Sequence, residues 1–189
     1  MGETRTIERH DAASARVTLT DGTELVLSGT NDVDHSNRGI VVWDLRYGRV
    51  EVDWGAFRRL HLEPDPGGGP CYGDHEGGHS LRGTVTDHAG FRHRGWIVLD
   101  LDEEATWEMV DGRWGGAEVS IPLERARRLE PDGDDGARIT LANGETLRLE
   151  GSSDVSSSSA GVLVQPLGGT PPTFLAWRDV ARIELTPES

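Results

Sequence analysis

The chain has 189 residues and a formal net charge of −14, and it contains no lysine and only one cysteine. The negative charge disfavours nucleic acids and anionic membrane surfaces as partners. The missing lysine excludes Schiff-base chemistry and a phosphate-binding lysine, and the lone cysteine excludes an internal disulfide.

Residues 13–63 carry short alternating runs that are typical of strands. Val17 and Leu19 alternate with polar residues, and so do Leu25 and Leu27. Asp21-Gly22 lies between these runs and predicts a tight two-residue hairpin. The runs GIVVWDL, RVEVDW and LHL follow, so this segment is predicted to contain four or five short strands.

The chain repeats this segment near its C-terminus. Residues 137–155 read ARITLANGETLRLEGSSDV, and a shift of 122 aligns them with residues 15–33 without a gap. The same shift takes Asp32 to Asp154, and after one inserted residue Trp54 corresponds to Trp177. Since the match spans about a quarter of the chain, the repeat decides the predicted fold.

The predicted fold is all-β, with three small barrel modules in tandem. Each module resembles SH3-like and Sm-like barrels in strand number and length, a resemblance of architecture that carries no functional residues. Modules this small are marginal alone, so we expect them to pack together or share strands, with the first and third related by a pseudo-twofold axis. The predicted boundaries are 13–63, 80–131 and 135–186, with a Gly/Pro/His linker at 64–79.

The second module is the least regular of the three, but its end repeats a spacing found in the others. Leu123, Ala126 and Leu129 have the spacing of Trp177, Val180 and Ile183. This spacing predicts a single helical turn that plugs one end of the barrel and leads into the closing strand.

The loop at residues 30–37 offers several side-chain oxygens, which are the ligands that calcium prefers. The calcium hypothesis uses Asn31, Asp32, Asp34 and Asn37. However, the equivalent loop of the third module keeps only the aspartate, as Asp154, and replaces the others by serine. A loop that shares its glycines and one aspartate between copies is more typical of a structural turn.

Two further patterns could support chemistry. Cys71, His75 and His79 are each four residues apart in the linker and are possible zinc ligands, although a solvent-exposed linker in which histidine is simply common is the favoured explanation. Asp100, Asp102 and Glu104 could act as the paired carboxylates of a hydrolase, against the alternative of a solvated acidic surface.

Taken together, the sequence favours a non-catalytic binding or scaffolding protein whose partner is another protein. No cofactor is expected, and oligomeric state and compartment stay open. No apolar run is long enough to span a membrane and the N-terminus has no hydrophobic signal core, although a trimmed signal peptide would leave no trace. The candidate binding residues are the loop residues peculiar to the first module and two tryptophans outside the strand pattern: Asn31, Asp34, Asn37, Arg38, Trp107 and Trp114.

Overall fold

The structure, a computed structural model, describes residues 4–30, 32–37, 39–63, 78–168 and 170–186. These residues form strands and turns, with helical structure limited to 3-10 turns of three residues, so the all-β prediction is confirmed. None of the described helices is long and apolar enough to cross a membrane. Two compact units are distinguished: Met1–Val41 with Glu51–Glu76, and Val42–Val50 with Gly77–Ser189.

The first unit contains a four-stranded antiparallel sheet in the order β3-β2-β1-β6. Its strands are β1 (Thr4–Arg9), β2 (Ser14–Leu19), β3 (Glu24–Ser28) and β6 (Arg59–His61). Ala15, Val33, Trp54 and Phe57 form its buried core, with Ile7, Ile40, Val52 and Leu60 partly buried against them. This core is small, so packing stabilises the first unit only modestly.

A second, twelve-stranded antiparallel sheet has the order β15-β14-β8-β7-β16-β11-β12-β13-β9-β10-β5-β4. Its early strands are β4 (Ile40–Asp44), β5 (Gly48–Val52), β7 (Arg82–Asp87), β8 (Arg92–Leu99), β9 (Met109–Trp114) and β10 (Ala117–Pro122). The later ones are β11 (Ala126–Pro131), β12 (Gly136–Leu141), β13 (Thr146–Glu150), β14 (Val162–Pro166), β15 (Thr173–Leu175) and β16 (Val180–Leu185). The 3-10 turns are η2 (Leu123–Arg125), η3 (Ser153–Val155) and η4 (Trp177–Asp179).

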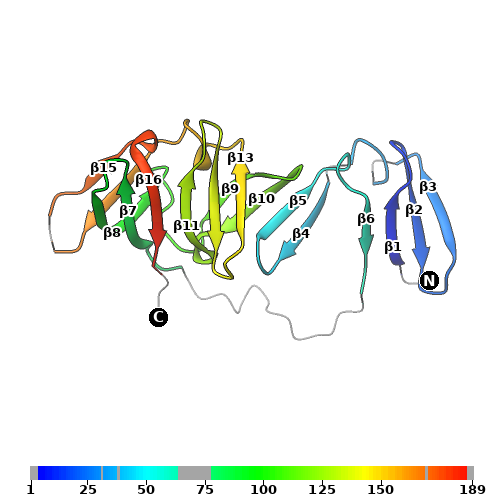
Figure 1. The fold of residues 1–189 in the computed structure, drawn as a ribbon. Coiled ribbons are helices and arrows are strands. Elements are labelled where there is room, and N and C mark those ends of the chain that lie inside the picture. The colour runs from blue at the N-terminus through cyan, green and yellow to red at the C-terminus, as the bar shows by residue number, and fades with distance from the viewer. Residues whose placement is uncertain (1–3, 31, 38, 64–77, 169, 187–189) are drawn as a thin grey trace. The chain divides into compact units, whose positions relative to one another are not determined.

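The strand order of the second unit is symmetric. Strands β7 to β11 correspond one by one to strands β12 to β16. If every strand from β15 to β10 is replaced by its counterpart, the new order is the reverse of the original order. The centre of this symmetry is the β11–β16 pair, where Leu129 lies opposite Ile183. In Figure 1 the red strand β16 lies beside the green strand β7, with Ile183 opposite Val85.

Segments 82–131 and 136–185 therefore exchange strands. β14 leaves its own segment to pair with β8, and β9 pairs reciprocally with β13. Strand sharing was expected from the small size of the modules, and the described residues of the second unit show it. Both sheets are open in the described residues and neither is a closed barrel. The division into three modules is not tested by this arrangement and stays a prediction.

Two local predictions can be compared with the structure. The predicted helical turns exist as η2 and η4, whose Leu123 and Trp177 are buried. The Asp21-Gly22 turn lies where it was predicted, but Leu19 N donates to Thr23 O, which leaves a loop of three residues rather than two. Only Gly22 has positive φ there, as a three-residue loop requires, and the Asp21 carboxylate accepts a hydrogen bond from Thr23 N.

Candidate protein-binding surface

The most unusual surface of the first unit is strand β3, which presents apolar side chains to solvent. Leu25 is 43% exposed and Leu27 is 42% exposed, and all five residues of the strand are exposed. Leu25 lies opposite Val17 and Leu27 opposite Ala15 on β2, so both leucines share the face that carries the buried core. Leucine side chains on a core face are normally covered.

The repeat provides a direct comparison for these residues. The shift of 122 takes Leu25 to Leu147 and Leu27 to Leu149 on β13, where they are 2% and 0% exposed. β9 lies at the outer edge of β13, where Glu150 is opposite Arg113, and both leucines are part of the large buried core of the second unit. Gly112 of β9 lies so close that a Cβ placed on it would be 2.7 Å from Leu149 Cβ. β3 has no such neighbour among the described strands, since it ends its sheet.

The backbone of β3 is also available along its outer edge. Leu19 N donates to Thr23 O, and the register pairs Val17 with Leu25 and Arg16 with Val26. Because antiparallel pairs alternate between hydrogen-bonded and non-hydrogen-bonded types, the N–H and C=O of Val26 and Ser28 point away from β2. An exposed apolar strand with an open edge is a ready site for strand addition.

A second exposed apolar strand is β4, at the end of the other sheet. Val42 is 41% exposed and Trp43 is 69% exposed. The corresponding strand in the repeat is β14, where Val164, the equivalent of Val42, is 0% exposed because β14 pairs with β8. β4 thus aligns with a strand that pairs across segments in the second unit, and its outer edge has no neighbour among the described strands.

The loop at residues 30–37 satisfies its own polar groups. Asp34 Oδ1 accepts hydrogen bonds from Ser36 N at 2.8 Å and Ser36 Oγ at 2.5 Å, and these bonds lower the pKa of the Asp34 carboxyl. Asn37 donates to Asp32 O at 2.8 Å and accepts from Gly39 N at 2.7 Å. These are the bonds of a structural turn. Asn31 and Arg38 lie outside the described residues.

Two aspartates of the second unit hold the exchanged strands. Asp154 Oδ2 accepts a hydrogen bond from Asp111 N on β9 at 2.7 Å. Reciprocally, Asp100 Oδ1 accepts hydrogen bonds from Ala160 N and from Ser159 Oγ, just before β14. Each carboxylate therefore fixes a strand contributed by the other segment. Of the acids proposed for hydrolysis, Asp100 is engaged in this way, whereas Asp102 and Glu104 are exposed.

Glu103 lies close to these aspartates and is the most perturbed titratable group described. Burial, together with the negative charges of Asp154 and Asp102, raises the pKa of the Glu103 carboxyl to about 8. Its buried Oε2 has no hydrogen-bond partner among the described residues. In the described part of the chain, no group of three or more metal-ligating side chains comes together here or elsewhere.

The remaining predicted site residues are dispersed. Trp107 is exposed but lies against the backbone of Gly78, and the ring of Trp114 packs against Tyr47 with centroids 5.6 Å apart. In the linker, Cys71 and His75 fall outside the described residues. His79 is described, and its backbone N donates to Thr106 Oγ1 at 3.0 Å. The structure therefore tests neither the tryptophans as contacts nor the zinc hypothesis.

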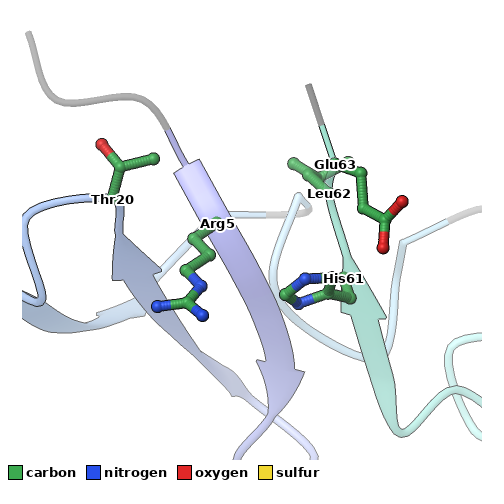
Figure 2. A pocket seen from close by; sticks show the side chains of 5 residues that line it. All are labelled: Arg5, Thr20, His61, Leu62 and Glu63. Carbon is green, nitrogen blue, oxygen red and sulfur yellow. The ribbon is translucent and has the colours of Figure 1, made fainter. Parts of the chain in front are cut away.

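Figure 2 shows an open recess at one end of the first unit, lined by Arg5, Thr20, His61, Leu62 and Glu63. These side chains come from β1, the β2–β3 turn and the end of β6. The recess has a volume of about 460 Å³ and places one cationic and one anionic side chain around the same opening. This mixed charge selects neither an anion nor a cation, so the recess assigns no ligand.

The leucines of β3 are the candidate residues that sequence reasoning missed. Their alternation with polar residues predicts a strand and does not indicate that its apolar face is exposed. The signal that could have identified them is a comparison of the modules: an exchanged neighbour covers β13, and the first unit's described residues include no equivalent of β9.

Comparisons of the chain with protein families, with curated proteins and with solved structures gave no match.

Proposed function

We propose that this protein is a non-catalytic binding protein that takes up a strand from a protein partner along the outer edge of β3. The observation that carries the proposal is the contrast between Leu25 and Leu27, which are 43% and 42% exposed, and Leu147 and Leu149, which are buried. Both copies of the repeat therefore have leucine at these two positions, and only the first copy exposes it. An apolar face with an open backbone edge favours strand addition over small-molecule binding.

The chain itself supplies the probe for a test. A peptide with the sequence of residues 160–168, AGVLVQPLG, contains β14, a strand that pairs with β8 in the second unit. We expect this peptide to bind the full chain and to slow amide hydrogen exchange at Val26 and Ser28, whose N–H groups face the open edge.

Two controls make the test specific. The same peptide with N-methylated backbone amides loses its donors, so it is expected not to protect β3. In the protein, Val26→Pro removes one outward N–H without removing a β2–β3 hydrogen bond, whereas Val26→Thr retains the N–H and the branched shape. Binding that is equal in both variants, or unchanged amide exchange at β3, would rule out strand addition at this edge.

A further inference from the structure

We infer that the partner of β3 is strand β4 of a second copy of this chain, so that two copies exchange strands reciprocally. This inference rests on the proposed function and adds the identity of the partner. Its basis is that the same chain carries an uncovered acceptor strand, β3, and an uncovered donor strand, β4.

The second unit supplies the pattern twice. There, β13 receives β9 and β8 receives β14, and in each case the third strand of one segment pairs with the second strand of the other. By the shift of 122, β3 corresponds to the acceptor β13 and β4 corresponds to the donor β14. The chain therefore presents both halves of the exchange already seen in the second unit.

The two pairings of the second unit also predict the register. Glu150 lies opposite Arg113, and Trp96 lies opposite Gln165. These pairs are equivalent under the symmetry of the sheet. Shifting Glu150 and Gln165 back by 122 gives Ser28 and Trp43. We therefore expect Ser28 of one copy to lie opposite Trp43 of the second copy. Val42 of the second copy takes the place that Gly112 has beside Leu149, so the two strands must lie slightly farther apart at Leu27 than β9 and β13 do.

A reciprocal exchange of β4 between two copies forms a closed dimer. Each copy donates β4 and accepts β4 of the other along β3, which defines a twofold dimer rather than an open chain of copies. The pairing would cover the leucines of β3 together with Val42, the apolar residues whose equivalents in the second unit are buried. Two open strand edges would be removed at the same time.

Analytical ultracentrifugation over a dilution series tests the association. We expect a two-chain species for the wild-type protein, and its loss in Leu27→Glu, which places a charge on the acceptor, and in Val42→Glu, which places one on the donor. Phe91→Glu is the matched control, because Phe91 is an equally apolar, 68% exposed residue of the β7–β8 turn. This control is expected to remain dimeric.

Mixing the two variants distinguishes exchange from simple loss of stability. The Leu27→Glu chain keeps an intact donor and the Val42→Glu chain keeps an intact acceptor, so one of the two pairings can form between them. We expect partial recovery of the two-chain species on mixing. Two variants that had merely lost their fold would not restore association.

A cysteine pair tests the register. In a Cys71→Ser background, Ser28→Cys with Trp43→Cys is expected to form disulfides between chains, since opposed residues of antiparallel strands lie within disulfide range. Ser28→Cys with Val42→Cys points the thiols to opposite faces and is the control. A disulfide within one chain would overturn the inference in favour of β4 closing on β3 of its own chain.

The two proposals fail in different ways. A wild-type chain that stays a single-chain species at every concentration, yet binds the 160–168 peptide at β3, overturns the second copy as partner and leaves strand addition from another protein standing. A dimer that persists in both Leu27→Glu and Val42→Glu also overturns this inference, because its interface would lie elsewhere.

Discussion

The Tyr47 hydroxyl donates a 2.5 Å hydrogen bond to Glu145 Oε1, joining the turn between β4 and β5 to the turn between β12 and β13. The carboxylate raises the pKa of the Tyr47 phenol, and the ring is buried against Trp114. The Arg46 guanidinium lies 4.5 Å from the centroid of the same ring. Tyr47 thus anchors the hairpin of residues 42–50 within the second unit.

Removing the Tyr47 hydroxyl should remove its hydrogen bond to Glu145 while the ring stays packed against Trp114. We expect Tyr47→Phe to lower the free energy of unfolding by about 1.5–3 kcal/mol, the range for a hydrogen bond to a charged group. Urea unfolding measures the change. Combining it with Glu145→Gln should give a loss smaller than the sum of the two single losses, and additive losses would contradict a direct interaction.

Gly48 follows Tyr47 and allows β5 to approach β10 closely. It has φ of +78°, and a Cβ placed on it would lie 2.4 Å from Pro122 Cδ and 2.5 Å from Ser120 O. Gly48→Ala should therefore lower the free energy of unfolding by about 2–4 kcal/mol, through backbone strain and overpacking. Gly90 is the control, because it has φ of +89° with no atom within 4 Å of an added Cβ. Gly90→Ala should lose only about 1–2 kcal/mol, and equal losses would argue against close packing at Gly48.

Asp154 is expected to stabilise the exchanged strand β9 through its bond to Asp111 N. Asp154→Ala leaves that N–H without its acceptor, so we expect a loss of about 1–3 kcal/mol in the free energy of unfolding. Its equivalent in the first unit, Asp32, is exposed, and Asp32→Ala should change stability by less than about 0.5 kcal/mol. Hydrogen exchange localises the effect: the amides of β9 should lose protection in Asp154→Ala and retain it in Asp32→Ala.

Glu103 should make the second unit less stable as the pH rises. Its pKa is about 8 in the folded protein, against 4.5 for the ordinary carboxyl, so the folded state binds this proton more tightly. The stabilisation is complete below pH 4.5 and is lost as the pH rises to about 8. Because solvent screens a partly exposed group, we expect the loss to be about 2 kcal/mol.

Urea unfolding at several pH values measures this dependence. Glu103→Gln is isosteric and keeps a neutral side chain, so it should flatten the decline between pH 4.5 and 8. Glu104→Gln is the control, because Glu104 is the exposed neighbour in the same segment. A wild-type protein whose stability is constant over this range would contradict the assignment.

The loop at residues 30–37 is expected not to bind calcium with its described side chains. Asp34 and Asn37 already bond to groups within the loop, so a calcium ion would have to displace those bonds. Adding calcium should therefore release no heat in calorimetry and leave the melting temperature unchanged. A rise in melting temperature that disappears in Asp34→Asn would restore the calcium hypothesis.

Within the predicted modules the sequence indicated the strands well because their signals are local, whereas β1 lies before the first predicted module and was not predicted. The alternation of Val17 and Leu19, the positive φ of Gly29 and Gly39, and the buried turns at Leu123 and Trp177 depend on neighbouring residues alone. Strand exchange could not be predicted in the same way. Whether Leu149 is covered by its own segment or by β9 depends on long-range strand pairing. The alternation of apolar and polar residues carries no information about such pairing. The same limit applies to Leu25 and Leu27, whose exposure the alternation did not indicate.

The pairing of Val85 with Ile183 has a consequence for how the chain acquires its structure. Strand β7 (Arg82–Asp87) forms a ladder with β16, about a hundred residues later, and β8 pairs with β14, which also follows it by many residues. A topology dominated by such distant pairs has a high contact order, so this unit should fold slowly. During synthesis β7 and β8 can pair with each other at once, but their outer edges stay open until β14 and β16 have been made, and these edges are exposed to misassociation in that interval.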